Sequence, residues 1–229
     1  MKEIGYIVTN FSEKFGIPRQ SGLVETKGKI IFKPEYRTKD AFKGLEKFSH
    51  IWILWKFSKS IKKNWSATVK PPRLGGNKRL GVFATRSPFR PNPIGLSSVR
   101  LEKIEYDEKK GTILYISGAD MLDGTPIYDI KPYLPYTDCH DDARGGFADE
   151  VLEYQLEVEF PEELLMTLPM KYRNSVIEIL KQDPRPSYIK DKKRVYGVVY
   201  ANYNIRFRVQ DYIAEVLEVQ KINCNCSEP

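Results

Sequence analysis

The chain has 229 residues, a formal net charge of +7 and 41% hydrophobic, 12% aromatic and 29% charged residues. This length suits one large domain or a main domain with a small appended one, and the composition excludes a disordered or collagen-like chain. The apolar run at residues 51–55 is far shorter than the roughly 20 residues of a membrane-spanning helix, and residues 1–10 lack a signal-peptide pattern. We therefore expect a cytoplasmic protein without membrane contact.

Short strands dominate the expected structure before residue 160, because β-branched and aromatic residues recur in runs bounded by turn residues. The expected strands cover residues 4–9, 23–32, 48–57, 97–106 and 112–117. A hairpin connection is expected at 107–111, with Gly111 supplying a positive φ. One short helix is expected around 40–47, with Asp40 as its N-cap. This pattern predicts a barrel or a sandwich.

The character of the sequence changes near Val151. After a strand-like run at 152–160, Pro161 suits the first turn of a helix that extends to Leu180 and can break at Pro169-Met170. The runs 195–201 and 205–212 flank a hairpin turn, and 214–222 can add a further strand. The fold class is therefore mainly β, with an N-terminal domain at 1–150 and a small C-terminal α+β domain at 151–229.

Several enzyme classes are excluded by absent motifs. No Gly-x-Gly-x-x-Gly follows a strand into a helix, and no P-loop is present, so a Rossmann-type methyltransferase and a nucleoside triphosphatase are not expected. The pairing of His-x-Glu with Pro-Cys-x-x-Cys that marks zinc deaminases is also missing. Cys139, Cys224 and Cys226 are too few for a disulfide framework, and with only His50 and His140 beside them we expect no metal site.

Basic residues gather in two stretches. Residues 56–100 contain eleven Lys and Arg and no acidic residue, and residues 185–208 contain seven against the single Asp191. Aromatic residues are interleaved with both, and cations beside aromatic rings can hold phosphates and stack unpaired bases. A solvated charged surface over a core explains each stretch equally well.

Two loops carry the chemistry. In residues 81–101, three prolines stiffen the chain around Arg86 and Arg90, which favours a receptor for a carboxylate or phosphate over a structural crossover. In residues 123–126, the sequence Asp-Gly-Thr-Pro forms a turn that can receive a ribose diol or an amine. Taken alone, such a turn is better explained by an Asp side chain that bonds its own backbone.

Together with the segments 17–20, 44–52, 68–76, 129–133 and 182–188, these loops resemble the TsaA/TrmO-like family of tRNA threonylcarbamoyladenosine N6-methyltransferases, and the motifs appear in order along nearly the whole chain. The resemblance implies an N-terminal β-barrel, S-adenosylmethionine as cofactor and a homodimer. It also implies the cofactor contacts, which are Pro18, Arg19, Gln20, Phe57, Ser58, Arg86, Leu96, Asp123, Gly124, Thr125 and Pro126. Ser58 stands where family members often carry histidine.

The reaction implied is N6-methylation of threonylcarbamoyladenosine at position 37 of tRNA. Asp129, Lys131 and Tyr133 are the candidates for assisting proton removal, and the sequence does not choose among them. The expected contacts to the anticodon stem-loop are Lys70, Arg73, Arg90, Arg185, Lys192, Lys193 and Arg194. The alternatives are a non-catalytic RNA-binding barrel and the same cofactor chemistry on a different acceptor.

Overall fold

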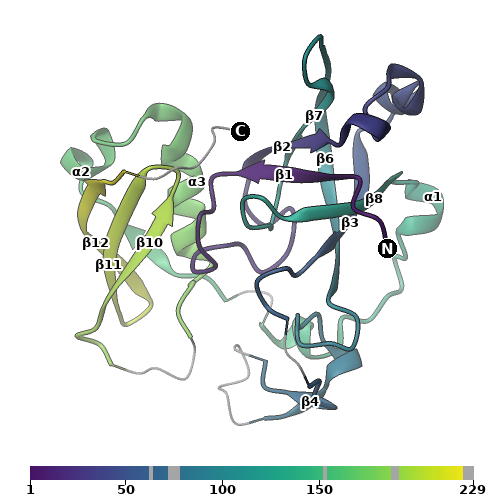
Figure 1. Cartoon of the computed structure of the whole chain (residues 1–229). Helices are drawn as coiled ribbons and strands as arrows, with labels where there is room; N and C mark the ends of the chain where they lie inside the picture. Colours follow the sequence, from purple (N-terminus) through teal and green to yellow (C-terminus); the bar gives the residue numbers. More distant parts are fainter. Residues whose placement is uncertain (62–63, 72–77, 152–153, 187–190, 224–229) are drawn as a thin grey trace.

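We describe a computed structural model that covers residues 1–61, 64–71, 78–151, 154–186 and 191–223. Six strands form a closed antiparallel barrel in the order β1-β2-β7-β6-β3-β8 (Figure 1). Their bounds are Gly5–Thr9 for β1, Lys27–Phe32 for β2, His50–Lys56 for β3, Ile94–Asp107 for β6, Gly111–Ser117 for β7 and Pro126–Pro132 for β8. The prediction of a mainly β fold with an N-terminal barrel is confirmed.

The interior of the barrel follows from side-chain alternation along the strands. In β3, Ile51, Ile53 and Trp55 are buried while the residues between them face outward. Ile7, Leu114 and Ile127 from other strands meet them in one apolar core. Burial of each such side chain contributes about 1.5–3 kcal/mol, so the pattern of β3 also fixes its register.

A second layer follows the barrel in the chain and lies beside it in Figure 1. Its sheet has the order β10-β11-β12-β9, with β9 parallel to β12 and the other pairs antiparallel. Two helices accompany this sheet. The bounds are Glu157–Glu159 for β9, Val195–Tyr200 for β10, Tyr203–Gln210 for β11, Ile213–Lys221 for β12, Glu162–Met166 for α2 and Met170–Lys181 for α3. The expected break of the helix at Pro169-Met170 is confirmed, and so is the further strand expected at 214–222, which is β12.

The remaining elements are short. Strands β4 and β5 form a two-stranded arm that extends from the barrel in Figure 1. The 3-10 turn η5 follows this arm in the chain. The bounds are Thr68–Val69 for β4, Leu80–Gly81 for β5, Val82–Ala84 for η5, Pro135–Asp138 for α1 and Gly146–Val151 for η6. Within the described residues, no helix is long and apolar enough to span a membrane.

Three expectations were wrong in detail. The helix around 40–47 is two 3-10 turns, η2 (Lys39–Phe42) and η3 (Leu45–Lys47), and Asp40 lies inside η2 after the N-cap Thr38; the 3-10 turn η1 (Pro34–Tyr36) precedes them. Strand β2 begins at Lys27, because the preceding segment crosses to the other core, where Val24 and Phe11 are buried. Strand β8 was not expected. The hairpin prediction holds, since Gly111 has φ +73°.

Candidate functional site

Three polar groups meet at one end of the barrel, where β3, β6 and the loop after β7 come together. The indole Nε1 of Trp55 donates to Ser97 Oγ at 2.9 Å, and that hydroxyl donates to Asp120 Oδ1 at 2.6 Å. Trp55 and Ser97 are buried because both point into the barrel from paired strands. The chain of hydrogen bonds therefore fixes a carboxylate at the barrel end.

The environment of Asp120 disfavours its ionised form. Burial raises the pKa of this carboxyl to about 6, although the hydrogen bond from Ser97, backbone hydrogen bonds including one from the N–H of Ser21, and the charge of Arg86 lower it. Such a buried and incompletely neutralised carboxylate marks a site rather than a stabilising contact.

Arg86 lies beside this carboxylate on the proline-rich loop. Its Nη1 donates to Oε1 of Gln20, which comes from the loop between β1 and β2. The guanidinium is exposed and keeps further donors for a planar anion. Two predicted cofactor contacts far apart in the sequence are thus brought together.

A hydrogen bond joins the Asp-Gly-Thr-Pro turn to β1. Asp123 Oδ1 accepts a hydrogen bond from the backbone N–H of Thr9 at 3.0 Å, while Gly124 has φ +71° and Thr125 is buried. The explanation that the Asp side chain bonds its own backbone does not hold, since its partner lies 114 residues away. Pro126 opens β8 opposite Tyr6.

An aromatic wall adjoins the polar groups. The rings of Trp55 and Phe57 have centroids 4.2 Å apart, and a Cβ added at Gly95 would lie 2.2 Å from the Trp55 indole. Glycine is therefore required opposite this indole. Ser58 follows at the end of β3 and is half-buried.

Two other predicted cofactor contacts, Leu96 and Arg19, point elsewhere. Leu96 lies on the outer face of β6 and is 54% exposed. Arg19 Nη2 donates to the backbone oxygen of Asp183 at 2.9 Å, so this guanidinium joins the loop after β1 to the C-terminal layer. Pro18, its neighbour, is buried.

The three candidates for proton removal lie along β8. Asp129 pairs in register with Leu54, whose other partner is Leu96, so these three residues share the outer face of the barrel. Lys131 Nζ lies 2.8 Å from Asp129 Oδ2, and this hydrogen bond and the carboxylate charge raise the pKa of Lys131. Lys131 therefore stays protonated and is a poor base.

Tyr133, the third candidate, packs against the aromatic rings of strand β3. Its ring centroid lies 5.6 Å from that of Trp52 and 6.2 Å from that of His50. These contacts hold the phenol on the same outer face.

Some of the predicted RNA contacts are already paired with an acidic or aromatic side chain of the fold, whereas others are exposed to solvent. Arg185 makes a bidentate pair with Asp183, at 2.8 and 2.9 Å, in which both side chains are largely buried. Lys192 Nζ lies 2.6 Å from Asp211 at the surface, and Lys193 is exposed. Arg194 lies over the Tyr196 ring at 5.3 Å.

The remaining predicted contacts belong to the first basic stretch. Arg90 Nη1 donates to the backbone oxygen of Thr85 at 2.7 Å, which supports the loop. Lys70 is exposed beside the two-stranded arm, whereas Arg73 lies outside the described residues.

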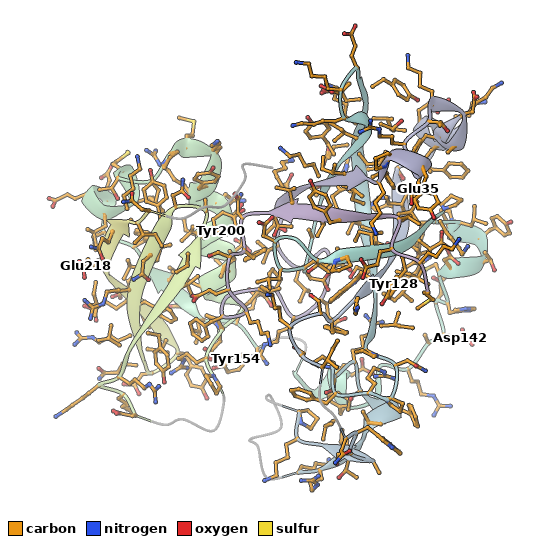
Figure 2. The ribbon with its side chains drawn as sticks, in the orientation of Figure 1. Glu35, Tyr128, Asp142, Tyr154, Tyr200 and Glu218 are labelled. Atoms are coloured by element: carbon orange, nitrogen blue, oxygen red, sulfur yellow. The ribbon has the colours of Figure 1, made fainter. Side chains whose placement is uncertain are left out.

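The second basic stretch is less positive than its sequence indicates. Arg206 and Arg208 on β11 pair with Glu218 and Glu215 on β12, at 2.9 and 2.6 Å. In Figure 2, Glu218 lies at the edge of the C-terminal layer far from the barrel.

Tyr154 lies near the loops that join the two layers in Figure 2. Tyr154 donates its hydroxyl proton to Asp183 at 2.7 Å, and burial raises the pKa of this phenol to about 12.

Sequence reasoning missed Asp120, Ser97 and Trp55 as site residues. The signal was weak, because a carboxylate, a hydroxyl and an indole in three separate segments form no motif until the barrel closes. Among the described residues, no three His, Cys, Asp or Glu side chains gather as metal ligands. Cys224 and Cys226 lie outside that part of the chain, so the absence of a metal stays a prediction.

Comparisons with known proteins identify the family of the chain. Residues 6–139 match the tRNA-methyltransferase O N-terminal domain, and residues 153–222 match the TrmO C-terminal domain. The chain is 42% identical over 228 residues to the tRNA (adenine(37)-N6)-methyltransferase of Escherichia coli (strain K12), covering 96% of this chain and 97% of that protein. It is 44% identical over 176 residues to the enzyme of the same name from Eikenella corrodens, covering 76% and 98%.

A crystal structure of TrmO from Pseudomonas aeruginosa superposes with a TM-score of 0.74 at 35% identity, covering 95% of this chain and 97% of that one. Since both domains match in order and a relative is similar over nearly its whole length, the chain belongs to the tRNA-methyltransferase O family.

Proposed function

We propose that the protein transfers a methyl group from S-adenosylmethionine to N6 of threonylcarbamoyladenosine at position 37 of tRNA. Full-length relatives are named tRNA (adenine(37)-N6)-methyltransferase, and others are named S-adenosylmethionine-dependent methyltransferases. The observation that carries the proposal is the meeting of Asp120, Arg86 and Gln20 at the barrel end. When bound, the cofactor supplies an electrophilic methyl group on a sulfonium.

The residues at the barrel end suit this cofactor by their charges and hydrogen-bonding groups. Arg86 and Gln20 offer donors for its carboxylate, whereas Asp120 and Asp123 offer acceptors for its α-amine or ribose hydroxyls. Phe57 adds an apolar wall. The raised pKa of Asp120 supports this assignment, because a cationic ligand would supply the neutralisation that the protein itself leaves incomplete.

Positioning provides most of the catalysis in this proposal. The bound cofactor would supply the methyl group for an in-line displacement, and the acceptor nitrogen would have to give up one proton. Asp129 is the residue we propose to receive that proton, since Lys131 remains protonated beside it. Tyr133, held by Trp52, is proposed to orient the acceptor base.

We also propose that the protein acts as a homodimer. The predicted site residues divide between the barrel end and the outer face of β6, β3 and β8, which carries Leu96 and Asp129. In a dimer, the barrel end of one copy can lie against the outer face of β6, β3 and β8 of the other copy, so that one site contains residues of both chains. Mixing Arg86→Ala with Asp129→Asn chains tests this: activity recovered in the mixture supports a shared site, whereas two inactive variants that stay inactive together oppose it.

The RNA is proposed to lie along the first basic stretch and the residues 192–194. Arg185 serves the packing of the C-terminal layer, because its guanidinium is held by Asp183. The division of the chain at residue 150 and a cytoplasmic location belong to the same proposal.

The test is incubation with labelled cofactor and tRNA that either carries or lacks the threonylcarbamoyl group. We expect label only in the modified tRNA. Binding of tRNA without any binding of cofactor would favour a non-catalytic RNA-binding barrel, and label in unmodified tRNA would indicate another acceptor. Arg86→Ala is expected to weaken cofactor binding at least tenfold while leaving the protein folded, since the residue is exposed.

A further inference from the structure

Large aromatic side chains are exposed together beside the proline-rich loop. Trp65 is 54% exposed, Phe83 is 73% exposed and Phe89 is 37% exposed. The rings of Trp65 and Phe83 have centroids 6.3 Å apart and an angle of 32° between their planes. Adjacent exposed rings of this size are a feature of binding surfaces.

The backbone holds Trp65 and Phe83 in place. Thr68 in β4 pairs with Gly81 in β5, and the N–H of Val82 donates to the oxygen of Ala67 at 2.9 Å. Turn η5 buries Val82, which directs Phe83 outward. The two rings are therefore presented on an ordered support, which lowers the entropy lost on binding.

The charge around these rings selects the kind of partner. The Arg90 guanidinium lies over the Phe83 ring at 5.8 Å, and Arg79 is fixed to Thr68 by hydrogen bonds of 2.7 and 3.0 Å. Residues 56–100 contain no acidic residue, and beside the two rings Arg79 and Arg90 bond to neutral groups of Thr68 and Thr85 and form no ion pair with a described carboxylate. An uncompensated positive surface favours a polyanion.

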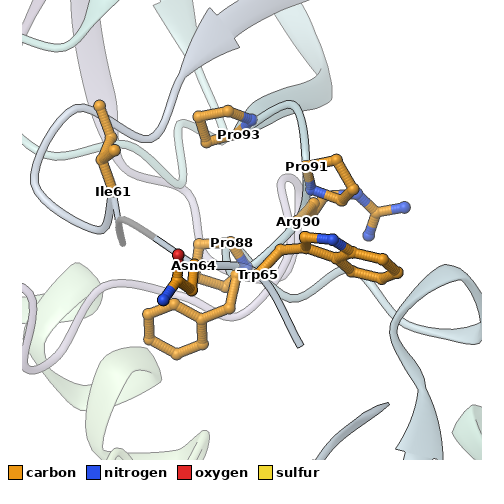
Figure 3. Close-up of a pocket in the computed structure, with 8 residues that line it drawn as sticks. Ile61, Asn64, Trp65, Pro88, Arg90, Pro91 and Pro93 are labelled. Atoms are coloured by element: carbon orange, nitrogen blue, oxygen red, sulfur yellow. The ribbon is translucent and has the colours of Figure 1, made fainter. Parts of the chain in front are cut away.

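The cavity beside Trp65 is too small to enclose a base. Trp65, Pro88, Arg90 and Pro91 line a cavity of about 40 Å³, which has room for a few water molecules. Figure 3 shows Trp65 beside Arg90 and Pro91 at the edge of this cavity. A ligand would therefore lie on the open faces of the rings.

We propose that Trp65 and Phe83 form a stacking site for an unpaired nucleobase of the RNA, with Arg79 and Arg90 beside the adjoining phosphates. A flat aromatic partner matches the two rings, and a phosphate chain matches the cations around them. This inference rests on the proposed function for the identity of the RNA as tRNA, and it places unpaired nucleotides on the arm rather than in the methyl-transfer site.

The test measures binding of the full chain to an RNA hairpin with a seven-nucleotide loop and to a fully paired RNA of equal charge. Trp65→Ala is expected to weaken hairpin binding about tenfold or more, because stacking on an aromatic residue contributes that much per base, and to change duplex binding less than about twofold. Trp65→Phe is expected to keep most of the affinity. Hairpin binding should also quench the fluorescence of the wild type, and this quenching should shrink in Trp65→Phe.

Tyr136→Ala is the matched control, since that ring is 85% exposed on α1 outside the basic stretch, and it is expected to leave both affinities unchanged. Equal loss of hairpin and duplex binding in Trp65→Ala, or no loss, overturns the proposal. A change in the sedimentation coefficient of Trp65→Ala also overturns it, because the rings would then serve contact between copies. Methyl transfer by the wild type is measured separately, so an inactive wild type with a working stacking site refutes only the proposed function.

Discussion

Replacing Asp120 by asparagine tests whether the ionised carboxylate at the barrel end lowers the free energy of unfolding. The substitution keeps the shape and an oxygen acceptor for Ser97 but removes the ionisation. The carboxyl has a pKa of about 6 in the fold against an ordinary value of 3.8, so it destabilises the fold above pH 3.8 and does so fully above pH 6. At one pKa unit per 1.4 kcal/mol, the destabilisation at pH 7.5 is about 3 kcal/mol.

The sign of the pH dependence is the reverse of the common one for aspartate. Because the pKa is raised in the fold, this destabilisation is complete above pH 6, decreases as the pH falls from 6 towards 3.8, and is about 1 kcal/mol at pH 4.5. Asp120→Asn should therefore increase the free energy of unfolding by about 3 kcal/mol at pH 7.5 and about 1 kcal/mol at pH 4.5.

Urea unfolding of both proteins at the two pH values measures this difference. Cofactor affinity, followed by calorimetry at pH 7.5, should fall in the same variant. Asp129→Asn is the control, since that carboxylate is exposed in a surface ion pair and should change stability by less than about 1 kcal/mol. A stability gain that is equal at both pH values, or a loss at pH 7.5, would refute the reasoning.

Two further substitutions test the packing that supports the site. Gly95→Ala should lower the free energy of unfolding by about 1–3 kcal/mol in urea unfolding, because its Cβ would lie 2.2 Å from the Trp55 indole; an unchanged midpoint would contradict the close approach. Arg185→Ala should cost about 3–5 kcal/mol in the same assay, since it leaves Asp183 buried without its cation, whereas Lys192→Ala should cost under about 1 kcal/mol at an exposed pair. Equal effects of the last two would argue against burial as the cause.

The sequence alone determined the class of the fold and most of its strands. Alternating apolar residues in 50–56 decide which face is buried, and Gly111 decides a turn, because both depend on neighbours close in the chain. The ordered motifs likewise indicate the family, because each motif is a short continuous run of residues. The sequence did not predict strand β8, because Pro126 and Asp129 are residue types that are uncommon in strands. This segment forms a strand by pairing with β1 and β3.

Only the tertiary structure decided which charges remain available. Arg206 and Arg208 look like part of a basic patch in the sequence, yet the next strand supplies Glu215 and Glu218 opposite them. Asp120 looks like an ordinary loop residue, yet closure of the barrel buries it beside Ser97. Both outcomes depend on contacts between segments that the linear pattern does not bring together, and Coulomb and solvation energies follow distance in space rather than along the chain.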